Sequence, residues 1–352
     1  MRNKILWLMS MCVLPFMVCA QQGGSSIFNF LNVAPGSYSH SMGGTMISTK
    51  NGDVSNSLQN PALLNSAMHN VSSFNLQFGF SGIRSGYVGY GNQFKKRKLN
   101  WGVGVQFTDY GTFTGADEWG NRRENFGAAD YALVFGLSRS LNDKFSIGVN
   151  SKLIYSQLET YIATGIGWDI GGHYALPERR AAIGVSVKNI GFVIKDYTDS
   201  GGLLPFDLQV GFSKKLKHLP FRYHITAHHL YKWDVRFSDP NIEASNILGE
   251  ESGPSAAAIF GDNLFRHFNL GGEFLLGEGE NLKLRFSYNH MLRRELLISN
   301  IRGIAGFNGG VEFKIKRFVV GYSFGLQHHH GSSKMISVST DFGKGKGKKK
   351  KT

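Results

Sequence analysis

The chain has very little cysteine and, after its first 20 residues, no long apolar run. Its two cysteines, Cys12 and Cys19, both lie within those residues. We expect them to leave with a secretory signal peptide, so the mature chain would have no disulfide, no thiolate metal site and no cysteine nucleophile. Beyond that segment no stretch approaches the roughly 18 apolar residues that a transmembrane helix needs. An exported chain of this kind is expected to be either soluble or a membrane barrel.

The signal peptide is predicted at residues 1–20, with cleavage before Gln21. Arg2 and Lys4 precede an apolar run that ends in Val18, Cys19 and Ala20, which is the order of charge, apolar core and cleavage site in secreted proteins. A lipid-modified start at Cys19 is the weaker alternative, because it would require a small residue at position 18.

The positive charge of the chain does not indicate a nucleic-acid partner. The formal net charge is +14, but Arg2 and Lys4 lie in the signal peptide and six lysines lie in the last nine residues. A protein that binds a duplex concentrates its charge on one folded face. We expect residues 343–352 to form a disordered, solvated periplasmic tail. A weaker interpretation is that this tail binds phosphate-bearing lipid or another anionic envelope polymer.

Apolar and polar residues alternate with period two in stretches of about ten residues. Leu282, Leu284 and Phe286, for example, alternate with Lys283 and Arg285. The chain also has 45 glycines and 27 phenylalanines, a composition that suits tilted strands with aromatic girdles. We therefore predict an all-β, transmembrane, antiparallel β-barrel. The alternative on the rhythm alone is a soluble β-sandwich.

About fourteen strands are expected, and the connectors between them alternate in length. Bacterial barrels have short turns on the periplasmic side and long loops outside. A sandwich has no reason to separate its loops in this way, so the alternation favours an integral outer-membrane barrel with both termini in the periplasm. The long connectors span residues 110–125, 191–205, 232–265 and 292–302. The predicted strands are roughly 72–80, 84–94, 99–109, 126–139, 144–157, 162–175, 180–190, 206–216, 221–231, 266–276, 281–291, 303–314, 316–326 and 333–342.

A barrel of this size encloses a lumen too wide for its own side chains to fill. Residues 21–70 are too long for a simple leader, and glycine, proline and asparagine interrupt them too often for strands. We predict that this segment folds inside the lumen as a plug or hatch, with Gly43, Gly44, Asn60 and Pro61 as its motif residues. The expected organisation is a signal peptide (1–20), a plug (21–70), the barrel (71–342) and the tail (343–352).

A series of short motifs lies in order along nearly the whole mature chain: Phe28-Asn29-Phe30-Leu31-Asn32, Met42-Gly43-Gly44, residues 53–65, Met68-His69-Asn70, Asp109-Tyr110-Gly111, Ala116-Asp117-Glu118 with Gly120, Ala129-Asp130-Tyr131-Ala132, Lys188-Asn189-Ile190-Gly191, Leu204-Pro205-Phe206, Lys214-Lys215-Leu216, residues 227–234, residues 262–267 and Arg293-Arg294-Glu295-Leu296. Together these motifs resemble the PorQ family of type IX secretion proteins. The resemblance implies a FadL-like outer-membrane barrel, related to PorV, that holds a PorZ-like surface protein beside PorU and PorV. That attachment complex processes cargo and attaches it to lipopolysaccharide. On this interpretation the chain is a non-enzymatic anchor.

Two long loops are the candidate contacts with the surface partner. Outer loops of such length are often binding elements. The 232–265 loop is the first candidate because it contains enough apolar residues for docking. The 110–125 loop is the second, because Trp and Arg are favoured at interfaces. The candidate residues are Phe113, Trp119, Arg122, Arg123, Ile242, Ile247, Leu248, Ile259 and Phe260.

The sequence indicates no catalytic, cofactor or metal site. No spacing of Ser, His and acid residues identifies a triad. Residues 328–330 are three histidines, but neighbouring residues of a strand point to opposite faces, so a solvated loop is favoured over metal binding. His228 and His229 are expected at the lipid headgroup level. Inward charges could line a path or pair across the lumen, and we favour pairing for Lys283, Arg285, Glu273 and Glu312.

Two other functions stay open. One is a FadL-like transporter of small hydrophobic molecules with a movable hatch, which a continuous apolar pocket at the plug and a lateral gap would favour. The other is a porin-like barrel with no dedicated partner.

Overall fold

The computed structural model describes residues 26–198, 201–236, 255–296, 304–328 and 331–345. Fourteen antiparallel strands form a closed barrel in which each strand pairs with its neighbours in the sequence and β1 pairs with β14. The strands are β1 (Val71–Phe78), β2 (Arg84–Phe94), β3 (Leu99–Phe113), β4 (Phe126–Ser140), β5 (Phe145–Leu158), β6 (Tyr161–Leu176), β7 (Ala181–Lys195), β8 (Asp207–Lys215), β9 (Phe221–Ala227), β10 (Phe268–Leu276), β11 (Leu282–Asn289), β12 (Phe307–Ile315), β13 (Phe318–His328) and β14 (Gly331–Asp341).

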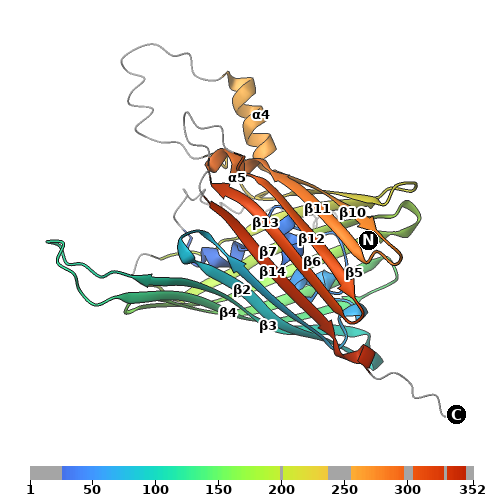
Figure 1. Cartoon of the computed structure of the whole chain (residues 1–352), viewed down its shortest axis with the longest axis horizontal. Coiled ribbons are helices and arrows are strands. Elements are labelled where there is room, and N and C mark those ends of the chain that lie inside the picture. Colours follow the sequence, from blue (N-terminus) through green and yellow to red (C-terminus); the bar gives the residue numbers. More distant parts are fainter. Residues whose placement is uncertain (1–25, 199–200, 237–254, 297–303, 329–330, 346–352) are drawn as a thin grey trace, which may run out of the picture.

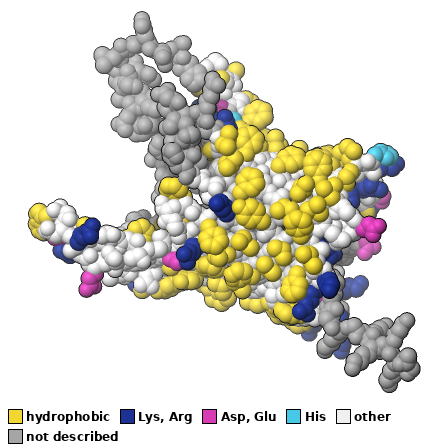
Figure 2. All heavy atoms as spheres, in the orientation of Figure 1, with side chains coloured by type: hydrophobic (Ala, Val, Ile, Leu, Met, Phe, Trp, Pro, Cys, Tyr) yellow, Lys and Arg dark blue, Asp and Glu magenta, His cyan; other side chains and the backbone are white. Residues whose placement is uncertain are grey.

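The barrel wall has an apolar outer face and a polar inner face, as the alternation predicts. Leu284 and Phe286 on β11 are exposed on the outside, whereas Arg285 between them is buried. Figure 2 shows apolar side chains gathered over the middle of the strands on the face in view. Among the described residues, no helix is both long and apolar enough to cross a membrane.

All fourteen predicted strands are present, with different ends. β3 runs on to Phe113 and β7 to Lys195, so these strands extend beyond the predicted ranges. β9 ends early, at Ala227. His228 and His229 therefore follow the strand, and the expectation that they lie at the headgroup level is wrong for His228, whose side chain is buried at 3% exposure. His229 has a positive φ of 56°, which turns the chain at this point.

Two helices lie at the long-connector end of the barrel. α4 (Ala256–Arg266) follows an N-cap at Ser255, whose hydroxyl accepts a hydrogen bond from Ala258 N, and α5 (His290–Glu295) follows an N-cap at Asn289. Figure 1 shows both helices at one end and the end of β14 at the opposite one. The helix α4 lies within the connector that we expected to be a loop.

The N-terminal segment of the described chain has short helical turns and no strand before β1. These are η1 (Asn29–Asn32), α2 (Ser37–Ser41), η2 (Val54–Leu58), η3 (Pro61–Leu63) and η4 (Ser66–Met68). The side chains of Asp53, Asn60 and Asn65 accept the backbone N–H groups that the turns after them leave free, which is the usual role of Asp and Asn at an N-cap. We call residues 26–70 the lumen segment.

Candidate functional site

The lumen segment lies inside the barrel and contacts strands on opposite walls. α2 packs on β11, β12, β13 and β14, whereas η3 packs on β4, β5 and β6. η2 contacts β1 and β2, and η1 contacts β3. Figure 1 shows this segment enclosed by the strands. Whether it closes the lumen to passage stays a prediction.

The motif Asn60-Pro61 fits against β5 and β6 because glycines line the wall there. The amide of Asn60 donates to Ile47 O at 2.9 Å and to Gly172 O at 3.1 Å, and its oxygen accepts from Ala62 N at 2.9 Å. A Cβ on Gly148 would lie 2.6 Å from Pro61 O. Because real Cβ atoms do not approach so closely, the wall can hold this backbone only if it has no side chain at that position.

α2 is bound to the opposite wall through small polar residues. Ser37 N donates to the hydroxyl of Ser337 at 2.9 Å. The ring of His40 lies between two serines, with Nδ1 2.9 Å from Ser323 Oγ and Nε2 2.8 Å from Ser333 Oγ. These groups are all buried, so separating α2 from the wall would leave several polar groups without partners.

The other predicted motif, Gly43-Gly44, follows α2 directly. Both residues have positive φ angles, 77° and 97°, a conformation that glycine adopts without strain. The turn that they form directs two carbonyls at the wall, where Asn289 Nδ2 donates to Gly43 O at 3.1 Å and Asn269 Nδ2 to Met42 O at 2.6 Å. The two glycines therefore allow the chain to leave α2 along β10 and β11.

A buried ionic network joins α2 to β9–β12. Glu273 is fully buried and lies 2.6 Å from Arg222 and 3.3 Å from Arg285. Arg285 also contacts Glu312 at 2.6 Å, and Lys283 contacts Glu312 at 2.8 Å. The four inward charges singled out in the sequence therefore pair with one another.

Tyr38 of α2 completes this network. Its hydroxyl donates to Glu273 at 3.1 Å, and the guanidinium of Arg285 lies 4.1 Å from the centre of its ring. No local pattern indicates this contact, because Tyr38 lies 235 positions from Glu273.

A second buried pair lies on β5 and β6. Lys152 and Asp169 are 2.7 Å apart, and their side chains are 1% and 0% exposed. Asn150 connects the pair to the lumen segment, because its amide donates to Asp169 at 3.0 Å and to Ser57 O at 2.9 Å. Buried charges are held in this way only when they are paired and hydrogen-bonded.

Aromatic and aliphatic residues of the lumen segment form an apolar cluster near the long-connector end. Phe28, Phe30 and Leu31 of the segment are buried. Their cluster also includes Leu58, Tyr87, Ala132, Val134, Ile154, Ala163 and Leu204.

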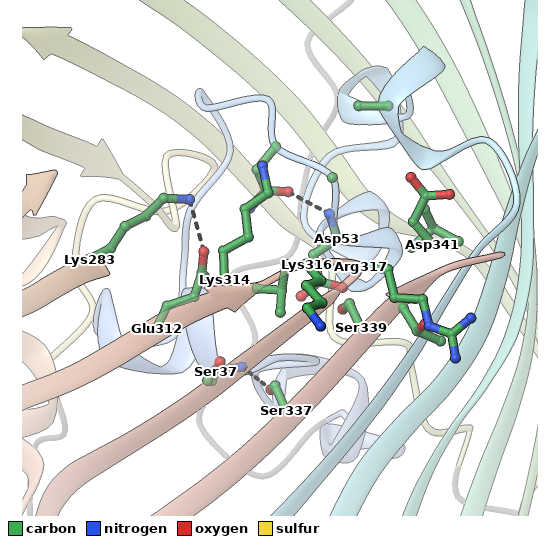
Figure 3. A pocket seen from close by; sticks show the side chains of 17 residues that line it. Ser37, Asp53, Lys283, Glu312, Lys314, Lys316, Arg317, Ser337, Ser339 and Asp341 are labelled. Atoms are coloured by element: carbon green, nitrogen blue, oxygen red, sulfur yellow. Dashed lines mark hydrogen bonds and ion pairs between the residues drawn. The ribbon is translucent and has the colours of Figure 1, made fainter. Parts of the chain in front are cut away.

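Two adjoining cavities, of about 210 and 240 Å³, open at the short-connector end. Both are lined by Asn51 and Gly52 of the lumen segment and by Lys283 and Lys314 of the wall. Figure 3 shows the first cavity, with polar and charged side chains from β12, β13 and β14 around Asp53. The first cavity has a mixed polar and apolar lining and the second a mainly polar one, so neither has the predominantly apolar lining expected for a site that binds hydrophobic molecules.

The candidate contact residues that the structure describes lie on two projections at the long-connector end. Trp119 is 78% exposed at the tip of the β3–β4 hairpin, where Phe113 stacks on Phe126 at 5.3 Å. Arg122 forms an isolated antiparallel β-bridge with Ala116, and Arg123 N donates to Gly115 O at 2.8 Å. These contacts extend the hairpin beyond the wall.

The other candidates belong to the connector that contains α4. Phe260 is 56% exposed and its ring lies 5.2 Å from that of Trp233, which is 52% exposed. Ile259 precedes it on the same helix, whereas Ile242, Ile247 and Leu248 lie outside the described residues. Trp233 was not among our candidates, although a tryptophan within the predicted 232–265 loop could have indicated it.

Hydrogen bonds and ion pairs fix α4, which carries Phe260, against Trp233 and α5. Trp233 O accepts from Asn263 Nδ2 at 2.6 Å and lies 2.9 Å from His267 Nε2. Asp262 lies 2.9 Å from Arg266 and 2.7 Å from Arg294 of α5.

Asp262 also lies 3.1 Å from His290 Nε2. Partial burial acts to raise the pKa of Asp262, but its hydrogen bonds with Arg266 and His290 and the nearby charges hold that pKa below its usual range.

The fold is similar to FadL-type outer-membrane barrels. The Pseudomonas putida toluene transporter TodX has 15% identity and a TM-score of 0.52, over 87% of this chain and 97% of that one. The CymD monoaromatic hydrocarbon channel has 14% identity and a TM-score of 0.53, over 89% and 97%. A Pseudomonas aeruginosa FadL homologue has 9% identity and a TM-score of 0.51, over 88% and 98%. No family model and no curated protein matches the chain.

Proposed function

We propose that this chain is an outer-membrane barrel of FadL type that serves type IX secretion as the anchor of a PorZ-like surface partner. PorU, PorV and lipopolysaccharide are the further expected components of its surroundings. In this proposal the short connectors and both termini face the periplasm, and the long loops face outward, as is usual for bacterial barrels.

The observation that supports the anchor most is the convergence of three PorQ-like motifs at one exposed surface. Residues 227–234, residues 262–267 and the Arg293–Leu296 motif are far apart in the sequence. They are joined by the bonds from Trp233 O to Asn263 and His267 and by the Asp262–Arg294 ion pair. The exposed Trp233–Phe260 pair lies next to these bonds. Aromatic side chains held on a rigid base are suited to be anchors of a protein interface.

The dense bonding of the lumen segment also supports an anchor. Tyr38, His40 and Asn60 are each bound to the wall through buried polar contacts. A hatch that moves during transport would have to break such contacts in each cycle, whereas a stationary scaffold gains stability from them.

The second candidate is a transporter of small hydrophobic molecules. The fold comparisons support this candidate better than the secretion role, because TodX is described as a toluene transporter and CymD as a monoaromatic hydrocarbon channel. In this case the lumen segment would be the movable part.

Gentle detergent extraction of the tagged full chain from its native envelope tests the two candidates. The anchor predicts that a secreted surface protein is recovered in stoichiometric amount and is lost from the double variant Trp233→Ala and Phe260→Ala. The matched control is Trp168→Ala with Phe192→Ala, an exposed Trp–Phe pair on the wall with ring centres 6.4 Å apart. Recovery of the barrel alone, with an apolar ligand inside it, would contradict the anchor and support transport.

A further inference from the structure

The two ends of the barrel differ in charge. The six short connectors contain ten Lys and Arg but only four Asp and Glu, so that rim is cationic. The connectors at the other end contain, by sequence, eight Lys and Arg and thirteen Asp and Glu, so they are anionic on balance. A difference of this size gives the two ends different ligand preferences.

The cations of the short-connector rim are spread over most of the barrel's circumference. They occur in five of the six short connectors, and all are exposed. Two of the four acids in these connectors are already neutralised, because Glu178 pairs with Lys144 and Glu280 with Lys215. The exposed cations are Lys95, Lys96, Arg97, Lys98, Lys144, Arg179, Arg180, Lys217, Lys316 and Arg317.

Large apolar side chains stand exposed beside cations of three of these connectors. Phe94 is 51% exposed next to Lys95, Leu219 is 59% exposed near Lys217, and Ile315 is 60% exposed next to Lys316. Figure 2 shows several Lys and Arg side chains at this end, where the apolar band of the wall stops. Apolar and cationic groups at one level match the boundary between acyl chains and headgroups.

We propose that this rim binds anionic phospholipid headgroups in the leaflet that surrounds it. That leaflet is the periplasmic one, so this identification rests on the orientation proposed above. An acidic protein is the less suitable occupant, because it would contact one sector of the rim, whereas the cations are distributed over five of the six short connectors. Lipids can contact every sector at once.

The test uses the full chain in nanodiscs of equal parts phosphatidylglycerol and phosphatidylcholine, with native mass spectrometry to count the lipids that the released barrel retains. The wild-type chain should be enriched in phosphatidylglycerol. The double variant Lys95→Gln and Lys96→Gln should lose about fivefold in this enrichment at low salt for each lysine removed. Neither lysine has an ion pair in the described part of the chain, so the barrel should fold normally.

The matched control is Arg84→Gln with Lys195→Gln, which removes two exposed cations at the opposite end. The control should retain phosphatidylglycerol as the wild type does. Equal retention of both lipids by the wild type, or an equal loss in both double variants, overturns the proposal, and so does capture of an acidic protein at this rim in place of lipid. Recovery of the surface partner is measured in the separate extraction experiment. The lipid preference of the rim can therefore be judged even if no surface partner is recovered. A lipid preference in an oppositely oriented barrel would overturn only the choice of leaflet.

Discussion

Adding a single methyl group at Gly148 should displace the lumen segment and leave the barrel wall intact. In the Gly148→Ala variant the new Cβ would lie 2.6 Å from Pro61 O and 2.7 Å from Ala62 N. Both are backbone atoms, so the turn must move away by several tenths of an ångström or more. The bonds from Ser146 Oγ to Ala62 O, at 3.2 Å, and from Asn60 to Gly172 O would lengthen with it. Overpacking of this kind costs about 1–3 kcal/mol of unfolding free energy.

The assay is ion conductance of the purified variant in planar bilayers, together with its thermal unfolding. If the lumen segment closes the lumen, conductance should rise and the unfolding temperature should fall. The matched control is Gly172→Ala on the neighbouring strand, whose Cβ would meet only Phe145 at 4.0 Å and should change neither quantity. Unchanged conductance in Gly148→Ala, with the expected loss of stability, would refute the view that this part of the segment closes the lumen.

The next three predictions concern a buried ion pair, the ion pairs of α4 and the orientation of the barrel. Glu273→Gln should reduce stability by about 3 kcal/mol, measured by thermal unfolding, because it leaves Arg285 buried with one partner fewer. The ion pairs of Asp262 should hold α4 at neutral pH and be lost only as the pH falls below about 4, since its pKa is depressed; α4 that already opens to hydrogen exchange at pH 6 would contradict this. Both cysteines of the chain lie within the predicted signal peptide, so Glu118→Cys should react with an impermeant maleimide on intact cells and Lys96→Cys only after permeabilisation, and the reverse result would invert the orientation.

The strands could be predicted from the sequence because their signal is local. Alternation along β11 depends only on which side of the wall each residue faces, and this side changes at every residue. The ends of the strands depend on distant groups. His229 N donates to Asp207 Oδ1 at 2.7 Å, and this contact with β8 helps to turn the chain after Ala227. No local pattern contains that information.

The candidate site could be predicted only in part. The exposed positions of Trp119 and Phe260 agree with the sequence-based choice, but Trp233 and the Asp262 cluster needed the geometry. α4 could have been found from the serine N-cap and the three alanines that follow it. The contact between Tyr38 and Glu273 could not, because it depends on how α2 is placed across the lumen.

The closing of the barrel between β1 and β14 has a consequence for assembly. The lumen segment precedes β1 in the chain, yet α2 rests on β11–β14, which are the last strands to be made. η3 rests on β4–β6, which are made early. The segment can thus pack on β4–β6 first and then provide α2 as a packing surface for β11–β14. In this order the chain's own N-terminal part is an internal template, around which the last strands are aligned before the wall closes.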